Sequence, residues 1–231
     1  MKLPTSLQPA TVIARLNRFA VAVEVAAHRD VAHLPNSGRL EELLVPGTAA
    51  LLAPRSSPGR KTAFDLALVR YPTPDNLVSV DARLPSVLVE EALQAGELAP
   101  FLCYPSLRRE VRFGDSRLDF MLQGERGFCL LETKSISWVV DGCALFPDAP
   151  TERGQRHLRT LIEGRRAGHR AAVVFVIQRS DAYGFSPCRP ADPAFAATLV
   201  DAAAEGVEVY AYRCEVREDG MRILAPVPVG L

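Results

Sequence analysis

The chain has 231 residues, 48% of them hydrophobic and 23% charged, and its formal net charge at pH 7 is zero. This composition is that of a globular protein, and it excludes both a disordered chain and a surface that is basic throughout. Any contact with nucleic acid must therefore come from a local basic face. Five scattered cysteines without a C-x-x-C pair predict free thiols and a cytoplasmic location. No long apolar run follows a basic start, so we expect neither a signal peptide nor a membrane span.

The first third of the chain has the pattern of short strands separated by turn residues. After the segment Asn36-Ser37-Gly38, a capped short helix is predicted over residues 39–44. Five or so strands with one small helix are typical of a compact barrel of the oligonucleotide-binding type, which we assign to residues 1–83. Few aromatic side chains are expected on its surface, which argues against stacking of single-strand bases. The predicted strands cover residues 10–27 with a break near Asn17, 31–34, 49–53, 64–71 and 77–80.

The loop from His33 to Arg39 is the distinctive segment of this barrel. Its backbone amides, with the side chains of His33 and Arg39, could hold a phosphate near a helix start. The sequence Pro-Asn-Ser-Gly within the loop is equally a good turn followed by a cap. The pattern favours the structural interpretation, with phosphate binding as the alternative.

The remaining residues, 84–231, predict an α/β domain with a mixed central sheet flanked by helices. Ser86 is expected to cap its first helix, which ends at Gly96. The apolar run at residues 170–178 predicts a central strand that is covered on both faces. Residues 139–150 and 179–192 are expected to be loops. The predicted order is a helix at 87–95, strands at 107–113, 117–123 and 128–135, a helix at 150–167, a strand at 170–178, a helix at 193–205, and strands at 207–216 and 221–224.

Three charged residues lie within the hairpin formed by the second and third of these strands. Asp119 is on one strand, and Glu132 and Lys134 share a face of the next. Burying charge is costly unless it is paired or bound to metal. Two carboxylates could hold Mg²⁺ or Mn²⁺, with Lys134 orienting a water; a simple charge ladder neutralised by Lys134 is the alternative. Only three lysines occur in this Arg-rich chain, which favours a specific need for an ammonium group at position 134.

The helix predicted at residues 150–167 carries a basic side. Between residues 151 and 170 there are six arginines and two glutamates, and Arg153 and Arg156 recur at helical spacing near Gln155. Such a face could track phosphates or could simply be solvated. His157 and His169 have no ligand spacing and are expected at the surface. Glu90 or Glu91 of the first helix could add a third acid to the metal site, although each is also a typical solvated helix charge.

The order of these elements, with Asp on the second strand and Glu-x-Lys on the third, resembles the PD-(D/E)xK nuclease-like fold. The whole chain then resembles the sugar fermentation stimulation protein family. This second resemblance rests on His33-Leu-Pro-Asn-Ser-Gly38, Ser116-Arg-Leu-Asp119-Phe120, Glu132-Thr-Lys134-Ser135, Phe146-Pro-Asp148-Ala149, Thr151-Glu-Arg-Gly-Gln155 and Gln178-Arg-Ser-Asp181. Thr133 departs from the Val usual in the family, and Leu34 departs from a common Cys.

The resemblance implies a barrel followed by a nuclease-like domain in a DNA-binding protein linked to sugar metabolism. One function it implies is a metal-dependent nuclease in which Asp119 and Glu132 hold Mg²⁺ or Mn²⁺, Lys134 positions water, and Glu90 is a peripheral ligand. In that reading Arg117 and Gln155 steady phosphate or ligands, and double-stranded DNA is the expected partner. The alternative is a non-catalytic DNA-binding regulator that keeps the fold. A third class is a metabolic enzyme acting on a phosphorylated sugar, but the sequence contains no nucleotide or phosphate-loop motif that would support it.

Overall fold

Alternating apolar residues in the first eighty positions close a small barrel. The computed structural model describes residues 1–4, 6–71, 76–125 and 127–231. Its first sheet has the order β3-β2-β1-β4-β5-β6, and a parallel pairing of β3 with β5 closes it. The inward residues, which include Val12, Val23, Leu52 and Leu66, form one apolar core. The strands are β1 (Gln8–Asn17), β2 (Ala20–Val25), β3 (His28–His33), β4 (Ala49–Pro54), β5 (Phe64–Arg70) and β6 (Leu77–Ser79).

The helix predicted over residues 39–44 is wrong. These residues form turns, and Leu40 has a φ of 52°, which interrupts a right-handed helix. The first two N–H groups of the segment, at Arg39 and Leu40, donate to the Asp148 carboxylate instead, at 2.6 and 3.4 Å. A contact spanning more than a hundred residues thus replaces the local cap that the sequence pattern suggested.

The second sheet is mixed and has the order β15-β14-β12-β9-β8-β7. The three consecutive strands β9, β12 and β14 are parallel, and the other neighbouring pairs are antiparallel. The apolar strand β12 lies in the middle, as predicted. Residue 126, in the turn predicted between β8 and β9, lies outside the described residues. The strands are β7 (Ser106–Phe113), β8 (Ser116–Gly124), β9 (Gly127–Ile136), β12 (Arg170–Ile177), β14 (Glu208–Val216) and β15 (Met221–Pro226).

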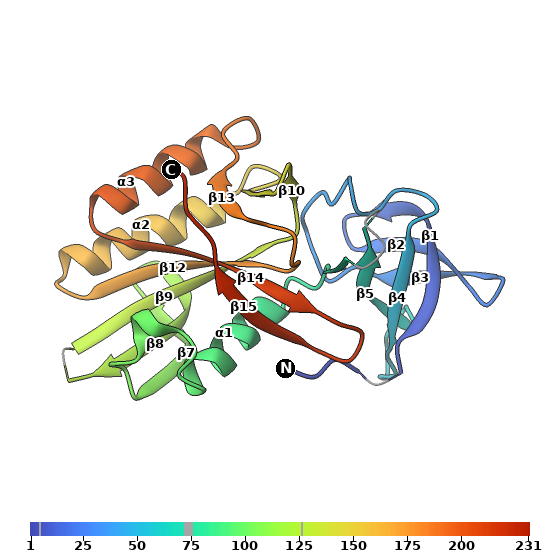
Figure 1. Ribbon diagram of the computed structural model, residues 1–231, viewed down its shortest axis with the longest axis horizontal. Coiled ribbons are helices and arrows are strands. Elements are labelled where there is room, and N and C mark those ends of the chain that lie inside the picture. The colour runs from blue at the N-terminus through green and yellow to red at the C-terminus, as the bar shows by residue number, and fades with distance from the viewer. Residues whose placement is uncertain (5, 72–75, 126) are drawn as a thin grey trace.

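Helices cover both faces of this sheet, which confirms the predicted two-part α/β architecture (Figure 1). Helix α1 (Leu84–Gln94) and a short 3-10 turn (Ala99–Phe101) lie on one face, and α2 (Glu152–Arg166) and α3 (Pro193–Ala204) lie on the other. Thr151 and Asp192 cap α2 and α3 by accepting the N–H groups of Gly154 and Phe195. Ser86 does not cap α1, because the helix starts earlier with Pro85 in its first turn.

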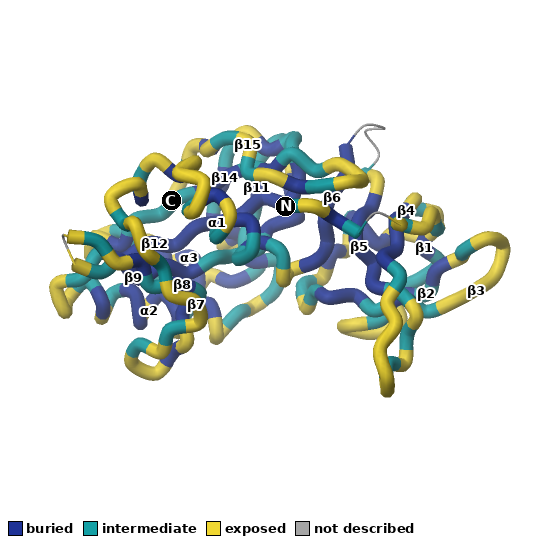
Figure 2. The backbone as a smooth tube through the Cα atoms, turned by 90° about the horizontal axis from the view of Figure 1, so that it is seen from below, coloured by how far each residue is buried: buried dark blue, intermediate teal, exposed yellow. Residues whose placement is uncertain are grey.

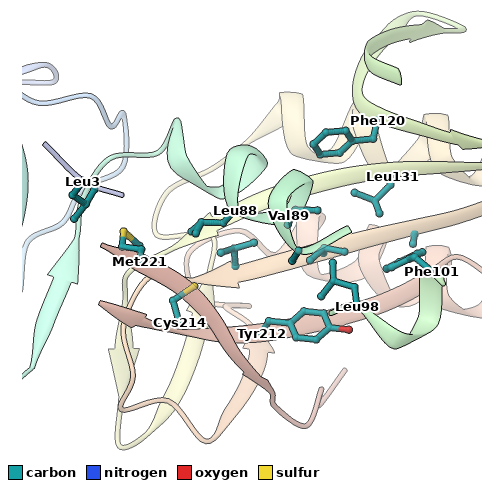
Figure 3. Packing of buried hydrophobic residues seen from close by; sticks show 14 of the residues in the cluster. Leu3, Leu88, Val89, Leu98, Phe101, Phe120, Leu131, Tyr212, Cys214 and Met221 are labelled. Atoms are coloured by element: carbon teal, nitrogen blue, oxygen red, sulfur yellow. The ribbon is translucent and has the colours of Figure 1, made fainter. Parts of the chain in front are cut away.

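Each face of the sheet has its own apolar cluster. On the α1 face, Leu88 and Val89 pack against Phe120 and Leu131 (Figure 3). The other cluster joins α2 and α3 to β9 and β12. Buried residues are concentrated in the central strands of this sheet and in the strands of the barrel, while the β2–β3 hairpin projects into solvent (Figure 2). None of the described helices meets the length and apolarity needed to cross a membrane.

Both segments predicted as loops contain strands. β10 (Val139–Val140) pairs with β11 (Cys143–Phe146), which runs parallel to β13 (Gly184–Pro187) in a small separate sheet. The segments are rich in Gly, Pro and Asp, so no local pattern distinguishes them from loops. Their pairing is decided by the larger sheet, which brings the two segments side by side.

The two parts of the chain are joined by polar contacts at the ends of strands. The backbone of Gln178, just after β12, accepts the N–H of Ser79 in the barrel and donates to Ile136 of β9, at 3.0 and 2.7 Å. The next residue, Arg179, is almost fully buried; it donates to Ser137 O and lies 4.3 Å from the ring centroid of Tyr71. These contacts fix the barrel against the ends of β9 and β12.

A second junction is centred on Asp65 of β5, whose side chain is 3% exposed. Its carboxylate accepts hydrogen bonds from Arg55, Arg60 and Arg83, the last of which precedes α1. Burial alone would raise the pKa of Asp65, but the hydrogen bonds from Arg83 and Arg60 outweigh burial and lower it. The ionised carboxylate thus links the barrel to the start of the second part.

Replacing Asp65 with Asn should destabilise the protein by about 1.5–3 kcal/mol at pH 7, the range for a hydrogen bond to a charged group. Because the folded-state pKa lies below the usual value of about 3.9, the stabilisation is present above that value and is lost as pH falls through the folded pKa. Urea unfolding at pH 7 and at low pH measures both effects. Glu24→Gln, an exposed change on β2, is the control; an equal loss in both variants would contradict the prediction.

Candidate active site

The site forms where strands β8 and β9 stop pairing regularly. Their ladder runs from Gly124↔Gly127 to Phe120↔Leu131. At the next position the carboxylate of Asp119 accepts the backbone N–H of Thr133 at 2.8 Å and the Thr133 hydroxyl as well. On the other side of β8, Glu110 would face Asp119 in an unbroken ladder but has a φ of 51°. Regular pairing is thus interrupted at Asp119 on both sides of β8. Its carboxylate takes the place of a backbone acceptor and binds the N–H of the neighbouring strand.

Glu132 is the buried acid of the site, with 3% of its surface exposed. One of its oxygens accepts a hydrogen bond from Lys134 Nζ at 2.6 Å and also contacts His157 Nδ1. Arg153 Nε donates to His157 Nε2 at 3.4 Å. The tautomer with its proton on Nδ1 satisfies the contacts with Glu132 and Arg153, because Nδ1–H donates to Glu132 and Nε2 accepts from Arg153. Lys134 Nζ also lies 3.4 Å from Nδ1. Lys134 and His157 together compensate a carboxylate that would otherwise be costly to bury.

The two acids have opposite pKa shifts. Burial alone would raise the pKa of Glu132, but the charge of Lys134 and the hydrogen bond from His157 outweigh it and lower this pKa. Burial, followed by the negative charge of Glu132, raises the pKa of Asp119 against the opposing bonds from Thr133. Glu132 is therefore held ionised by its neighbours, while Asp119 is short of compensating positive charge.

This arrangement fits a divalent cation held by two protein carboxylates. Asp119 Oδ1 accepts no hydrogen bond from the described residues, and both acids offer the oxygen ligands that Mg²⁺, Mn²⁺ and Ca²⁺ prefer. A cation here would also supply the positive charge that Asp119 lacks. Within the described ranges no group of three His, Cys, Asp or Glu residues is arranged to hold a metal, so water would have to complete the shell, as is usual for Mg²⁺.

Glu90, the expected third acid, is not brought to the pair. It lies on α1, which covers the sheet face opposite to that of α2 and His157, and its carboxylate pairs with Arg109 at 2.6 Å. Arg117, two residues before Asp119 along β8, is exposed and lies 3.5 Å from Glu110. The structure therefore does not bring its guanidinium to the described contacts of the acid pair.

Of the site residues predicted on α2, some make hydrogen bonds around the site and others are exposed to solvent. Gln155 Nε2 donates to the Asp192 carboxylate at 3.4 Å, and its Oε1 accepts from Arg159. Arg153 reaches the cluster through His157, whereas Arg156 is exposed. The exposed side chains of Arg153, Arg156 and Arg159 thus form a basic edge beside the site.

The two residues predicted in the barrel loop serve mainly its structure. His33 Nδ1 lies 3.1 Å from Phe19 O, and the backbone N–H of Arg39 is bound by Asp148. The Arg39 carbonyl accepts a hydrogen bond from Arg15. The loop faces the second part of the chain, so it approaches the site without joining the cluster.

His157 is the site residue that sequence reasoning missed, and its expected surface position is wrong. It is 3% exposed and contacts the carboxylate of Glu132. A signal was present, because Leu158 and Leu161 form the apolar stripe of α2 and helical periodicity puts residue 157 on the same buried side. His169 is partly buried between the rings of Phe113 and Phe128.

Comparison with known proteins decides the family. Residues 83–220 match the sugar fermentation stimulation protein RE domain, and residues 13–80 match the N-terminal OB domain that accompanies it. The chain belongs to the sugar fermentation stimulation protein family. It is 48% identical over 233 residues to a homologue from Moorella thermoacetica, covering all of both chains. A homologue from Chloroflexus aurantiacus is 48% identical over 96% of this chain and 85% of its own.

A solved structure of the same family has the same fold. The structure of Pyrococcus furiosus SfsA in complex with Ca²⁺ superposes with a TM-score of 0.91 at 30% sequence identity, covering 100% of this chain and 98% of that one. The match extends over the barrel and the second sheet together. The relative arrangement of the two parts is therefore shared with that structure.

In this family member, the contact between His157 and Glu132 should appear as a coupling in a double-mutant cycle. His157→Leu removes the proton donor from a buried carboxylate, a loss of about 1–3 kcal/mol, whereas the same change in a Glu132→Gln background should cost less. Urea unfolding of the four proteins at pH 7 gives the coupling energy. His28→Leu, at an exposed position on β3, is the matched control. Strict additivity of the two changes would show that the contact contributes nothing.

Proposed function

We propose that this protein is a metal-dependent nuclease of the PD-(D/E)xK type that hydrolyses phosphodiester bonds in DNA. Residues 84–231 would form the nuclease-like domain and residues 1–83 an OB-like domain. The observation that carries the proposal is the cluster of Asp119, Glu132 and Lys134 at the split between β8 and β9. The cluster combines the buried, ionised Glu132, the ammonium group of Lys134, and Asp119, whose carboxylate has little compensating positive charge.

Asp119 and Glu132 would hold Mg²⁺ or Mn²⁺. Such a cation supplies positive charge to the phosphoryl oxygens and makes a nearby water more acidic. Support for a divalent cation comes from the Ca²⁺ complex of the Pyrococcus furiosus relative. The undercompensated charge of Asp119 is the feature of this chain that a cation would relieve.

Lys134 would position the attacking water. Its ammonium group has three N–H donors, one of which is directed at Glu132 Oε1 at 2.6 Å. The others remain to hold a water or a phosphate oxygen beside the acids. His157 would act as a positioning residue, because it fixes the same Glu132 oxygen from the helix side. Thr133 orients Asp119 through its backbone N–H, a contact that the Val usual in the family would also provide.

The basic edge of α2 would hold the DNA backbone next to this cluster. Arg153, Arg156 and Arg159 are exposed, and their described partners are a histidine or an amide rather than an acid. Arg166 and Arg170, in contrast, are paired with Glu205 and Glu208. The unpaired positive charge of α2 is therefore concentrated at its N-terminal half, near the cluster, where it would attract phosphates in a salt-dependent manner. The partner expected from the sequence, double-stranded DNA, suits such an edge.

A second candidate function is DNA binding without catalysis, as in a regulator of sugar metabolism. It is favoured by the contacts of Glu132, which Lys134 and His157 already compensate without a metal. The absence of a three-residue ligand group among the described residues also agrees with it. In this function the arginines of α2 would bind phosphates while the acids served only the fold.

A cleavage assay separates the two functions. Wild-type protein is incubated with linear, supercoiled and single-stranded DNA, and with RNA, in Mg²⁺, Mn²⁺ or EDTA. We expect cutting with a divalent metal and none in EDTA, and a loss of about 100-fold or more with Asp119→Ala or Lys134→Ala, as for removal of a group that stabilises the transition state.

The variants are prepared identically, so that a contaminating nuclease would cut equally in all samples. Unfolding curves confirm that each variant is folded, and Lys134→Arg tests whether charge alone suffices. The nuclease proposal would be contradicted if no DNA were cut with any metal while both variants still bound DNA in a salt-sensitive manner. That result would favour DNA binding without catalysis.

A further inference from the structure

A cavity of about 210 Å³ lies between the barrel and the second sheet. Segments that are distant in sequence line it. The barrel contributes Arg18 and residues 36–38, the end of β9 contributes residues 135–138, and the chain entering α2 contributes residues 145–151. Several of these residues belong to the motifs by which the sequence resembles its family, and the proposed nuclease chemistry uses none of them.

The cavity lies beside the proposed active site along β9. Glu132, Lys134 and Ile136 point to the same face of β9, and Ile136 lines the cavity. Thr151, which caps α2, lines it too, and His157 of the same helix contacts Glu132. A ligand group in the cavity would therefore lie next along β9 from Lys134, on the face that carries the acids.

The barrel wall of the cavity is held in place by backbone contacts. Asp148 accepts the N–H groups of Arg39 and Leu40. A Cβ atom at Gly38 would come within 2.5 Å of the same Asp148 oxygen, so a larger residue there would displace this carboxylate. Arg15 donates to the carbonyls of Arg39 and Arg18, the latter at 3.0 Å. The wall is thus formed before any ligand arrives, which lowers the entropic cost of binding.

The lining combines flat apolar surface with polar groups. Trp138, the only tryptophan of the chain, is partly exposed there beside Phe146 and Pro147. The guanidinium of Arg18 has no acidic partner among the described residues, and the exposed Ser37 makes no side-chain hydrogen bond with any of them. This combination suits a heteroaromatic ring with polar edges and an attached phosphate.

An aromatic platform adjoins the cavity through Arg18. The ring of Phe19 is 48% exposed, and Arg18 Cζ lies 5.5 Å from its centroid. The ring of His33 lies 6.4 Å away. Few aromatic side chains are exposed on the described part of the barrel, as expected, but Phe19 is one of them and lies where a base next to the cavity could stack.

We propose that this cavity binds the base of an unpaired DNA nucleotide, with a neighbouring base on Phe19 and the phosphate directed toward Lys134. The inference rests on the proposed function and narrows its substrate from duplex DNA to DNA with an unpaired nucleotide at the cut. A volume of about 210 Å³ is below the usual 300–1,000 Å³ of drug-sized sites, so it suits one base. A base reaches such a site only when it is outside the duplex stack.

Trp138 provides a direct readout of this binding. Wild-type protein in EDTA, where no cutting is expected, is titrated with a 20-mer oligodeoxythymidylate, with a 20-base-pair duplex, and with the same duplex carrying a short single-stranded gap. We expect quenching of Trp138 fluorescence by the oligonucleotide and the gapped DNA. Both should bind about tenfold more tightly than the intact duplex, as one stacked base provides.

Two variants test the cavity itself. Ser37→Phe fills it without breaking a described hydrogen bond, and Arg18→Ala removes its free cation. Each should abolish the preference for unpaired DNA, and Ser37→Phe should also abolish the quenching. Arg29→Ala, which removes an exposed cation from β3 outside the cavity lining, should preserve both. Unfolding curves establish that the variants are folded.

The outcomes distinguish this inference from the proposed function. Equal affinity for duplex and unpaired DNA, or an unchanged preference in Ser37→Phe, would overturn the inference while leaving the cleavage result intact. Quenching and preference that persist in Asp119→Ala would support the inference even if no DNA were cut. Protection of Trp138 in wild type but not in Ser37→Phe, measured with the neutral quencher acrylamide, would place the base in the cavity.

Discussion

The buried carboxylate of Glu132 is the constraint around which the second part of this protein is arranged. An ionised acid inside an apolar sheet is tolerated only with compensating partners, and here they come from β9 and from α2. Lys134 approaches from the same strand, whereas His157 requires that α2 cross the sheet at one particular position. The compensation of the Glu132 charge therefore depends on the packing of α2 against the sheet. Asp119, fixed by the backbone of Thr133, completes the cluster.

The barrel takes part in the site through the way it is attached. Gln178 and Arg179 at the end of β12 bind the ends of β6 and β9, and Arg179 stacks on Tyr71. Asp148 binds the barrel loop from the segment that leads into α2. These contacts are hydrogen bonds between polar groups that are largely buried. Because such bonds are directional, they specify one arrangement of the barrel relative to the second sheet. The cavity next to the cluster exists because both parts are held at this distance.

Much of the fold was predictable because it follows local patterns. Alternation in the barrel strands, the apolar run of β12 and the amphipathic stripe of α2 each have a short-range physical origin. The predicted helix at 39–44 failed because Leu40 takes a left-handed backbone conformation and the segment is bound by Asp148. The strands β11 and β13 were missed because they pair with each other across some forty residues of sequence, where no periodicity indicates pairing. The strand β10, which pairs locally with β11, is only two residues long.

The sequence by itself determined the family and the barrel followed by an α/β domain. It also predicted the trio Asp119, Glu132 and Lys134, since strand periodicity puts Glu132 and Lys134 on one face of their strand. Only the tertiary structure decided what surrounds that trio. It brought His157 to Glu132, kept Glu90 with Arg109 across the sheet, and joined Arg18 to Trp138 around one cavity. The reason is physical: helix and domain positions depend on packing between distant segments, and these contacts leave no local pattern in the chain.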